Sequence, residues 1–214
     1  IVPDRQEGPH AHSVTLSPDD RFAFVADLGM DRIVTYRLNA GTGTLAACNP
    51  PETICAPGSG PRHMAFHPDG RHVFLIHELG NTIAGYRYDA AHGILEARQT
   101  LASLPEDWVG TSYAADIHVS LDGRHLYASN RGHDSVVFFA IDMQNGMLTR
   151  KGFAPCRGHW PRNFLLTKNG ALMIVANQES DSLTVFRVDS DTGALIPVGE
   201  PFPVPAPVCV TART

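Results

Sequence analysis

The sequence lacks the marks of several large classes of protein. It has no run of Lys or Arg and a formal net charge of −5, so nothing in it predicts a surface for nucleic acid or an anionic membrane. No stretch approaches the roughly eighteen apolar residues of a transmembrane helix, and the first ten residues have neither the basic nor the apolar region of a signal peptide. We therefore expect a small molecule or a protein as partner, and neither a nucleic acid nor a membrane.

Cysteine is scarce, and several catalytic motifs are missing. The four cysteines, Cys48, Cys55, Cys156 and Cys209, form no C-x-x-C pair and are too few for a disulfide scaffold. We expect reduced thiols in a cytoplasmic protein, with a Cys48–Cys55 disulfide as the alternative for an exported one. The G-x-S-x-G elbow, the P-loop and the G-x-G-x-x-G fingerprint are also missing, which argues against an α/β serine hydrolase, a P-loop enzyme and a Rossmann dehydrogenase.

What the sequence does contain is a fourfold repeat in a chain large enough for one core. Of its 214 residues 43% are apolar and 18% charged, as in ordinary soluble proteins. Similar segments cover residues 11–45, 61–95, 114–148 and 161–195. Aligned on the turn residues Asp20, Gly70, Gly123 and Gly170, they are 50, 53 and 47 residues apart, with an apolar run on each side of the turn. Such a period predicts one structural unit per repeat.

Each repeat has the pattern of a small antiparallel sheet. Three or four short runs rich in Val, Ile, Phe and Tyr are separated by polar turns, and no segment sustains a 3.6-residue period. Repeats of this kind are typical of β-propeller blades. We expect residues 1–214 to form one all-β propeller domain of four-stranded antiparallel blades, with about four blades and a closing strand at residues 204–212.

Four blades are too few for the usual closed ring of about six to eight. The chain opens on Ile1 rather than on Met, and no strands before the first repeat are present to pair with residues 204–212. We therefore expect either that N-terminal blades are absent from these 214 residues or that the chain self-associates to close the ring.

The repeat register also selects candidate site residues, because equivalent positions can be compared directly. The entry of the first strand is occupied in turn by His12, Arg62, Ala115 and Arg162, and the next position by Ser13, His63, Asp116 and Asn163. The second strand ends on Asp27, His77, Asn130 and Asn177, followed by Leu28, Glu78, Arg131 and Gln178. Packing alone would favour the same residue in every blade. A change of charge at a fixed position therefore suggests a function, while the short polar side chains at the ends of the second strands, Asn130 and Asn177 above all, are expected to serve turns.

Arginine outnumbers acid at these positions. If Arg62, Arg131 and Arg162 converge on one channel mouth, Glu78 cannot neutralise all of them, and an anionic ligand becomes the natural partner. The alternative is that each arginine pairs with a local acid such as Asp134 or Asp181, or lies on the surface.

Histidines and tryptophans leave further alternatives. His10 and His12 are two apart, so they could face one way and hold a metal ion, but no third ligand is evident and we expect none. His118 lies in an apolar strand and is either a buried structural residue or part of the site, and His133 is similarly ambiguous. Trp108 and Trp160 precede inner strands and either roof the mouth or pack loops.

Several motifs together resemble one known family. The segments "GPHAHS", "GPRH", "HEL", "NRG" and "PVPAPVCV" occur in the order found in the seven-bladed propeller lactonases, which include bacterial 6-phosphogluconolactonases and fungal carboxymuconate cyclases. The resemblance covers nearly the whole chain, while family members are longer at the N-terminus. It implies that the ring has seven blades and that this chain supplies its C-terminal portion.

The resemblance also implies a catalytic site. The motifs that carry the proposed site of the cyclase branch correspond to His12, Arg62, Glu78 and Arg131, the positions that the register had already selected. The neighbouring His10, His63, His118 and Arg162 are expected to bind substrate.

The implied activity is hydrolysis of a sugar-acid lactone, above all of 6-phospho-D-glucono-1,5-lactone to 6-phosphogluconate in the pentose phosphate pathway. We expect Glu78 or His12 to be the general base, Arg62 to face the oxyanion, and Arg131 with Arg162 to hold the phosphate or carboxylate. No metal or organic cofactor is expected. The alternatives are a lactonising cyclase that acts on a carboxylated muconate and a non-catalytic propeller that binds a ligand or a protein.

Overall fold

Each repeat forms one antiparallel sheet in the computed structural model, which describes residues 1–212. The first blade comprises β1 (Ala11–Leu16), β2 (Phe22–Asp27), β3 (Arg32–Asn39) and β4 (Thr44–Ile54). The second comprises β5 (Pro61–Phe66), β6 (His72–His77), β7 (Thr82–Asp89) and β8 (Ile94–Ala102). The third comprises β9 (Tyr113–Val119), β10 (His125–Arg131), β11 (Ser135–Ile141) and β12 (Leu148–Pro155). The fourth comprises β13 (Pro161–Leu166), β14 (Leu172–Asn177), β15 (Ser182–Val188) and β16 (Leu195–Pro203).

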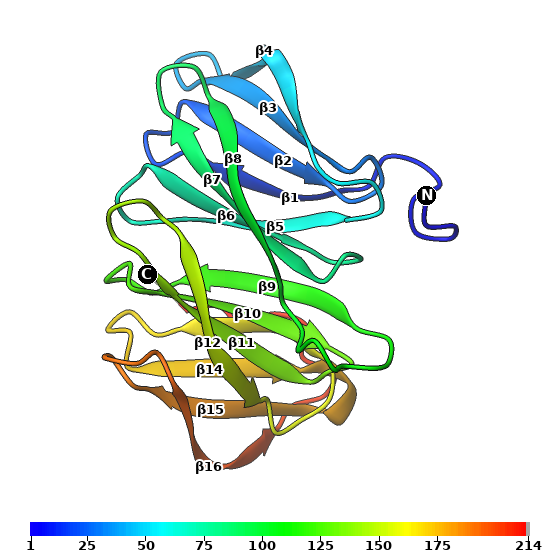
Figure 1. Ribbon diagram of the computed structural model, residues 1–214, viewed down its shortest axis with the longest axis vertical. Helices are drawn as coiled ribbons and strands as arrows, with labels where there is room; N and C mark the ends of the chain where they lie inside the picture. The colour runs from blue at the N-terminus through cyan, green and yellow to red at the C-terminus, as the bar shows by residue number, and fades with distance from the viewer. Residues whose placement is uncertain (213–214) are drawn as a thin grey trace.

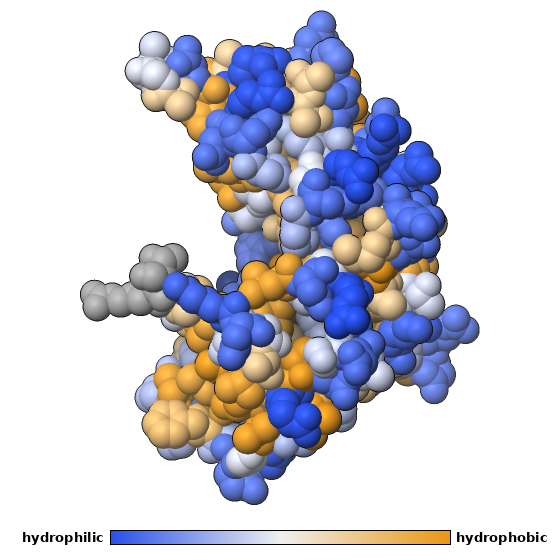
Figure 2. Space-filling model, turned by 90° about the vertical axis from the view of Figure 1, so that its left-hand side faces the viewer, coloured by the Kyte–Doolittle hydropathy of each residue, from blue (hydrophilic) through white to orange (hydrophobic). Residues whose placement is uncertain are grey.

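The blades follow one another along the molecule (Figure 1), and within each blade every strand pairs with the next one in sequence. Successive first strands lie side by side, β1 with β5, β5 with β9 and β9 with β13. Figure 2 shows the result as an open arc with a hollow on one side. The prediction of an all-β propeller is confirmed. Within residues 1–212, one 3-10 turn (η1, Gln178–Ser180) is the whole helical content, and no helix could cross a membrane.

Backbone conformation explains the constant period of the repeats. The four residues used for the alignment all have positive φ: Asp20 (54°), Gly70 (67°), Gly123 (75°) and Gly170 (69°). Gly, Asp and Asn adopt this left-handed conformation at the lowest cost, so they mark the tight turn between the first and second strands of each blade.

The apolar core lies between the blades. One cluster joins the first two blades through Phe22, Phe24 and Tyr88, and a second joins the next pair through Phe74 and Phe139. A third cluster, with Tyr127, Phe164 and Phe186, joins the last two blades. Because a middle strand is covered on both faces, β6 is buried at every residue from end to end. This burial explains why its sequence "HVFLIH" shows no polar alternation.

A repeated side-chain contact ties each blade to the next. Asp31, Asn81, Asp134 and Asp181 follow the second strands and all have positive φ, from 48° to 54°. The Asp31 carboxylate accepts hydrogen bonds from the N–H groups of Gly58 (2.7 Å) and Gly60 (2.8 Å), in the segment that enters β5. Gly60 has φ of 63°, and a Cβ there would lie 2.7 Å from Leu79. Asp31 therefore fixes the path of the chain into the second blade.

The expected closing strand is not formed. Residues 204–212 carry no strand assignment, although Val210 N–H donates to Asn163 Oδ1 on β13 (2.7 Å). A strand requires a partner backbone along its length, and the described chain offers this segment only isolated contacts.

Replacing Asp31 by Asn should weaken this connection without disturbing the turn, because Asn also tolerates positive φ. The amide presents one N–H-bearing atom, so one of the bonds from Gly58 and Gly60 is lost. We expect the free energy of unfolding to fall by about 1.5–3 kcal/mol, measured by urea denaturation. Asp191→Asn is the control, because Asp191 is 88% exposed; equal midpoints for the two variants would contradict the assigned role of Asp31.

Candidate active site

Backbone bulges present the charged residues at the entry of the inner strands. A register shift leaves His12 as the extra residue in β1, Arg62 in β5 and Arg162 in β13. In β9 the irregularity falls at Ala115 and Asp116. A bulge bends the strand and redirects the side chain of the extra residue. The position that varies in charge along the sequence is therefore also the position where the fold departs from regular pairing.

One buried carboxylate, Glu78, gathers three arginines. Glu78 Oε2 accepts a hydrogen bond from Arg62 Nε (2.8 Å) and forms an ion pair with Arg131 Nη2 (2.9 Å), and Oε1 is bound by Arg5 Nη2. Arg62, Glu78 and Arg131 are all 5% exposed or less. Arg62 Nη1 also donates to the Ala115 carbonyl (2.6 Å). The predicted convergence of Arg62, Glu78 and Arg131 is observed, and the alternative of pairing with Asp134 or Asp181 is wrong.

Asp134 and Asp181 are occupied by the connections between blades. Asp134 Oδ1 accepts the Trp160 N–H (2.9 Å), and Asp181 Oδ1 accepts the Ala206 N–H (2.7 Å). Asn130 and Asn177 also act structurally, as expected: they bond to the Ser103 carbonyl (2.8 Å) and to Thr184 Oγ1 (3.1 Å).

The electrostatics of this cluster favour an ionised Glu78. Burial would raise the pKa of its carboxyl, but Arg131, Arg5 and Arg62 outweigh that effect and lower the pKa to about 2. Burial, together with Arg131, in turn lowers the pKa of Arg62 to about 10, so its guanidinium stays charged at neutral pH.

Aromatic rings enclose the arginines on one side. The guanidinium carbon of Arg5 lies 5.2 Å from the Tyr113 ring centre, and that of Arg131 lies 5.8 Å from Tyr113 and 5.6 Å from Trp160. Ring faces attract cations. Trp160 therefore lies at the mouth, as one alternative had it, whereas Trp108 packs against His133 in the neighbouring loop (4.6 Å between ring centres).

A second carboxylate, Asp116, gathers histidines beside the arginine cluster. His63 Nδ1 lies 2.8 Å from Asp116 Oδ1, and His118 Nε2 lies 3.0 Å from Oδ2. Asn163 Nδ2 (2.5 Å) and the Phe164 N–H (3.1 Å) donate to Oδ2 from β13. Burial would raise the pKa of Asp116, but its bonds to His118 and His63 hold that pKa well below its usual range. Asp116 thus connects three blades.

A cavity of about 410 Å³ adjoins the Asp116 cluster. It lies between β1, β5 and β9, and its polar lining consists of Ser13, Thr15, His63, Asp116 and His118. His12 packs edge to face on His63, with 5.2 Å between ring centres. The pKa of His12 is lowered to about 4 by partial burial and by the positive charge of Arg62, so the imidazole is neutral at pH 7.

The two remaining predicted residues, Arg162 and His10, have different surroundings. Arg162 makes no ion pair within residues 1–212, yet its charge contributes to lowering the pKa of His12, Arg62 and Arg131. It therefore lies near the cluster as an uncompensated cation. His10 instead meets Glu7 (Nε2–Oε1 3.3 Å), while His12 packs on His63.

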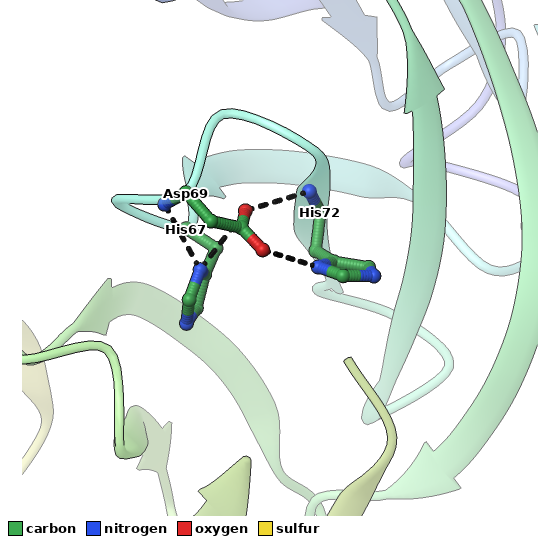
Figure 3. Close-up of side chains that lie close together, drawn as sticks. All are labelled: His67, Asp69 and His72. Atoms are coloured by element: carbon green, nitrogen blue, oxygen red, sulfur yellow. Dashed lines mark hydrogen bonds and ion pairs between the residues drawn. The ribbon is translucent and has the colours of Figure 1, made fainter. Parts of the chain in front are cut away.

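One group of metal-ligating side chains does exist, at the opposite end of the β5–β6 hairpin. Figure 3 shows His67, Asp69 and His72 around the "HPDGRH" turn, where His72 Nδ1 lies 2.8 Å from Asp69 Oδ2. His67 Nδ1 accepts the Asp69 N–H (3.1 Å), and its Nε2–H donates to the Gly123 carbonyl (2.9 Å). Ser17, Ser120 and Thr167 hold the corresponding turns through their hydroxyls. This group therefore serves the turn in the way that a hydroxyl does in the other blades.

Three contributors to the site were not among the predicted residues. Arg5 precedes the first repeat, so it has no counterpart in the register. Tyr113 lies two positions before Ala115, where the compared positions of its repeat begin. Asp116 was in the register, between His63 and Asn163, and its different charge there was the available signal.

Replacing Glu78 by Gln should leave Arg62 and Arg131 buried without their counter-ion. We expect a loss of about 3–5 kcal/mol in the free energy of unfolding at pH 7. The pKa of Glu78 falls from 4.5 to about 2 on folding, so its stabilisation is present above pH 4.5 and is lost as the pH falls toward 2. The difference between wild type and variant should therefore shrink across that range in urea titrations.

The exposed Glu106 provides the control for this experiment, as Glu106→Gln. A Glu78→Gln deficit that stays constant between pH 6 and pH 3 would show that the charge of Glu78 is not what stabilises the cluster.

Comparisons with known proteins give the same family that the motifs indicated. The family model described as "Lactonase, 7-bladed beta-propeller" matches residues 1–212. The 6-phosphogluconolactonase of Bacillus subtilis is 34% identical over 97% of this chain and 58% of its own length. An uncharacterized protein of Lactococcus lactis is 39% identical over 96% of this chain and 59% of its own length.

Solved structures of similar proteins support the same family. The periplasmic gluconolactonase PpgL of Pseudomonas aeruginosa superposes with a TM-score of 0.90 at 36% identity, over 94% of this chain and 56% of its own. A protein from Lactobacillus plantarum gives a TM-score of 0.92 at 34% identity, over 98% and 60%. This chain therefore spans less than two thirds of the length of these relatives. The match over residues 1–212 shows that the chain belongs to the seven-bladed β-propeller lactonase family.

Proposed function

We propose that this chain carries the site of a lactone hydrolase and that the substrate is an anionic sugar lactone. The observation that carries the proposal is the charge balance at the mouth. Glu78 is the single carboxylate on which Arg5, Arg62 and Arg131 converge. The positive charge of Arg162 adds to theirs and helps to lower the pKa of Arg62. A site with such a surplus of guanidinium groups favours a ligand that brings negative charge.

The arginines have donors left for that ligand. Arg62 uses Nε and Nη1 for Glu78 and Ala115, and within residues 1–212 its Nη2 has no hydrogen bond. We assign Arg62 to the oxyanion that develops on the lactone carbonyl, where a fixed cation lowers the barrier. Arg131 and Arg162 hold the remote phosphate or carboxylate. The cavity beside His63 accommodates the sugar ring.

The proposed substrate is 6-phospho-D-glucono-1,5-lactone. The Bacillus subtilis relative bears the name of that activity, and the arginine surplus suits a phosphorylated ligand. No metal or organic cofactor has a part in this chemistry. The cytoplasmic location stays a prediction, and the Pseudomonas aeruginosa relative is described as periplasmic.

Substrate choice should depend on Arg162. Arg162→Gln leaves no carboxylate of residues 1–212 unpaired, so the fold should be unaffected. We expect KM for the phosphorylated lactone to rise about 10- to 100-fold, because one charge-assisted contact to phosphate is lost, with little change for unphosphorylated glucono-1,5-lactone. Arg131→Gln should lower kcat/KM for both lactones, because Arg131 also pairs with Glu78, the carboxylate that holds Arg62 in place.

Arg187→Gln, on the exposed side of β15, is the control and should match wild type. Equal KM changes for both lactones would remove Arg162 from the phosphate site. Consumption of a carboxylated muconate in place of either lactone would identify a cyclase, and binding without turnover would identify a non-catalytic propeller.

We further propose that the faces of the end blades are covered in the working protein, by further blades of a longer chain or by self-association. Large exposed apolar side chains include Val14 (65%) in the first blade and Phe202 (64%) in the last. Figure 2 shows an apolar area over the last blade at one end of the arc. Faces of this kind pack against a neighbouring blade in a closed ring.

If these 214 residues form the whole chain, sedimentation equilibrium should give a mass that is a multiple of 23.2 kDa. The expected cause is burial of the exposed apolar faces. A monomer of 23.2 kDa that unfolds cooperatively would contradict the need for further blades.

A further inference from the structure

The mouth holds three candidates for the group that activates water, and they differ in what they contact. Glu78 and His12 are the predicted bases, and His63 was expected only to bind substrate. The choice among them rests on the proposed hydrolysis of a lactone at this same site.

Glu78 is poorly placed to take up a proton. Arg5 binds one of its oxygens, while Arg62 and Arg131 share the other, so both are committed as acceptors. Protonation would also strand the arginines beside a neutral group. This carboxylate is built to stay charged, with a pKa of about 2.

His12 has no hydrogen-bonded partner that would stabilise its protonated form. Within the described chain its side chain makes no hydrogen bond to a carboxylate. Its burial, the charge of Arg62 and the His63 ring oppose a positive charge and outweigh the more remote charge of Glu78.

We propose that His63, oriented by Asp116, is the general base that activates water in this site. The Asp116 carboxylate accepts from Nδ1 of His63 at 2.8 Å, which fixes the proton on Nδ1 and leaves the lone pair of the imidazole on Nε2. Asp116 is 3% exposed and is itself held from β9 and β13, so it cannot turn away. His63 is 28% exposed and lines the cavity of about 410 Å³.

Charged groups of both signs lie around the His63 ring. Arg62 Nη1 lies 3.2 Å from Nε2 but makes its shorter bond, 2.6 Å, to the Ala115 carbonyl. His12 from β1, Arg62 from the same strand and Asp116 from β9 contact His63 directly. His118 shares Asp116 with it, and Arg162 from β13 lies close enough for its charge to lower the pKa of His12 and Arg62. A carboxylate in direct contact stabilises the imidazolium that forms when Nε2 accepts a proton during turnover.

The proposed step conserves atoms and charge. Nε2 takes a proton from water as the water oxygen forms a bond to the lactone carbonyl carbon. The carbonyl electron pair moves to the oxygen, which faces Arg62. As the tetrahedral intermediate collapses, the bond from the carbonyl carbon to the ring oxygen breaks. The Nε2 proton passes to that oxygen, which yields the open hydroxy acid.

The test compares two His–Asp pairs of the same chain. His63→Gln should lower kcat/KM for lactone hydrolysis by about 10²- to 10⁴-fold and should abolish the loss of rate at acid pH. His92→Gln is the matched control. His92 is 68% exposed and lies 2.7 Å from Asp89, so it presents the same pair outside the site. Far-ultraviolet circular dichroism and thermal unfolding report whether each variant is folded.

Two further variants separate a base from a structural residue. Exogenous imidazole should restore part of the activity of His63→Ala. Asp116→Asn should lower kcat and move the acid limb of the pH profile to lower pH, because the imidazolium loses its counter-ion. A residue that only supports the fold would show neither effect.

The outcomes distinguish this inference from the proposed function. If wild type hydrolyses lactones and His63→Gln is as active as His92→Gln, His63 is not the base although the enzyme is a lactonase. If His63→Ala is folded but imidazole restores nothing and Asp116→Asn keeps the wild-type pH profile, the inference also fails. If wild type hydrolyses no lactone, the proposed function fails and this inference fails with it.

Discussion

The candidate site depends on one buried carboxylate that stabilises several buried cations. Arg62 and Arg131 come from different blades, and removing each from water is costly unless a counter-ion is at hand. Glu78 supplies that charge from the end of β6, between the two blades, and adds Arg5 from outside the repeats. The same contact holds the second and third blades in register at the mouth and presents guanidinium groups to a ligand, so stability and binding share one interaction.

Local irregularities of the backbone, and not regular strand pairing, position these side chains at the mouth. A bulge at the entry of the inner strand redirects His12, Arg62 and Arg162, and the contact of Asp31 with Gly58 and Gly60 sets the path into β5. The cores between the blades then make these positions rigid. A preorganised site needs such support, because a shift of about 1 Å in a charged group weakens both binding and catalysis.

Much of this arrangement could be predicted from the sequence, for a physical reason. A repeat fixes equivalent backbone positions, so charge that varies against a constant backbone is visible in one chain. Arg62, Glu78 and Arg131 were identified in that way, and the structure brings them into contact. The hydrogen-bond partners of the acidic residues were harder to predict from the sequence. Asp134 and Asp181 were possible partners for arginine, but their positive φ commits them to backbone N–H groups of the connections between blades. Arg5 has no equivalent in any repeat, and only tertiary structure brings it to Glu78.

The two carboxylates at the mouth, Glu78 and Asp116, have different electrostatic roles. Glu78 faces arginines, which remain charged, so its own charge is fixed and it serves to hold cations in place. Asp116 contacts His63 and His118, so it is positioned to stabilise a proton on a neighbouring ring. In the proposed reaction the proton would move on the histidine side, and the charges on the arginine side would stay constant. A proposed anionic substrate would then meet unchanging cations while the proton moves next to it, and this separation would let one small mouth combine anion binding with base catalysis.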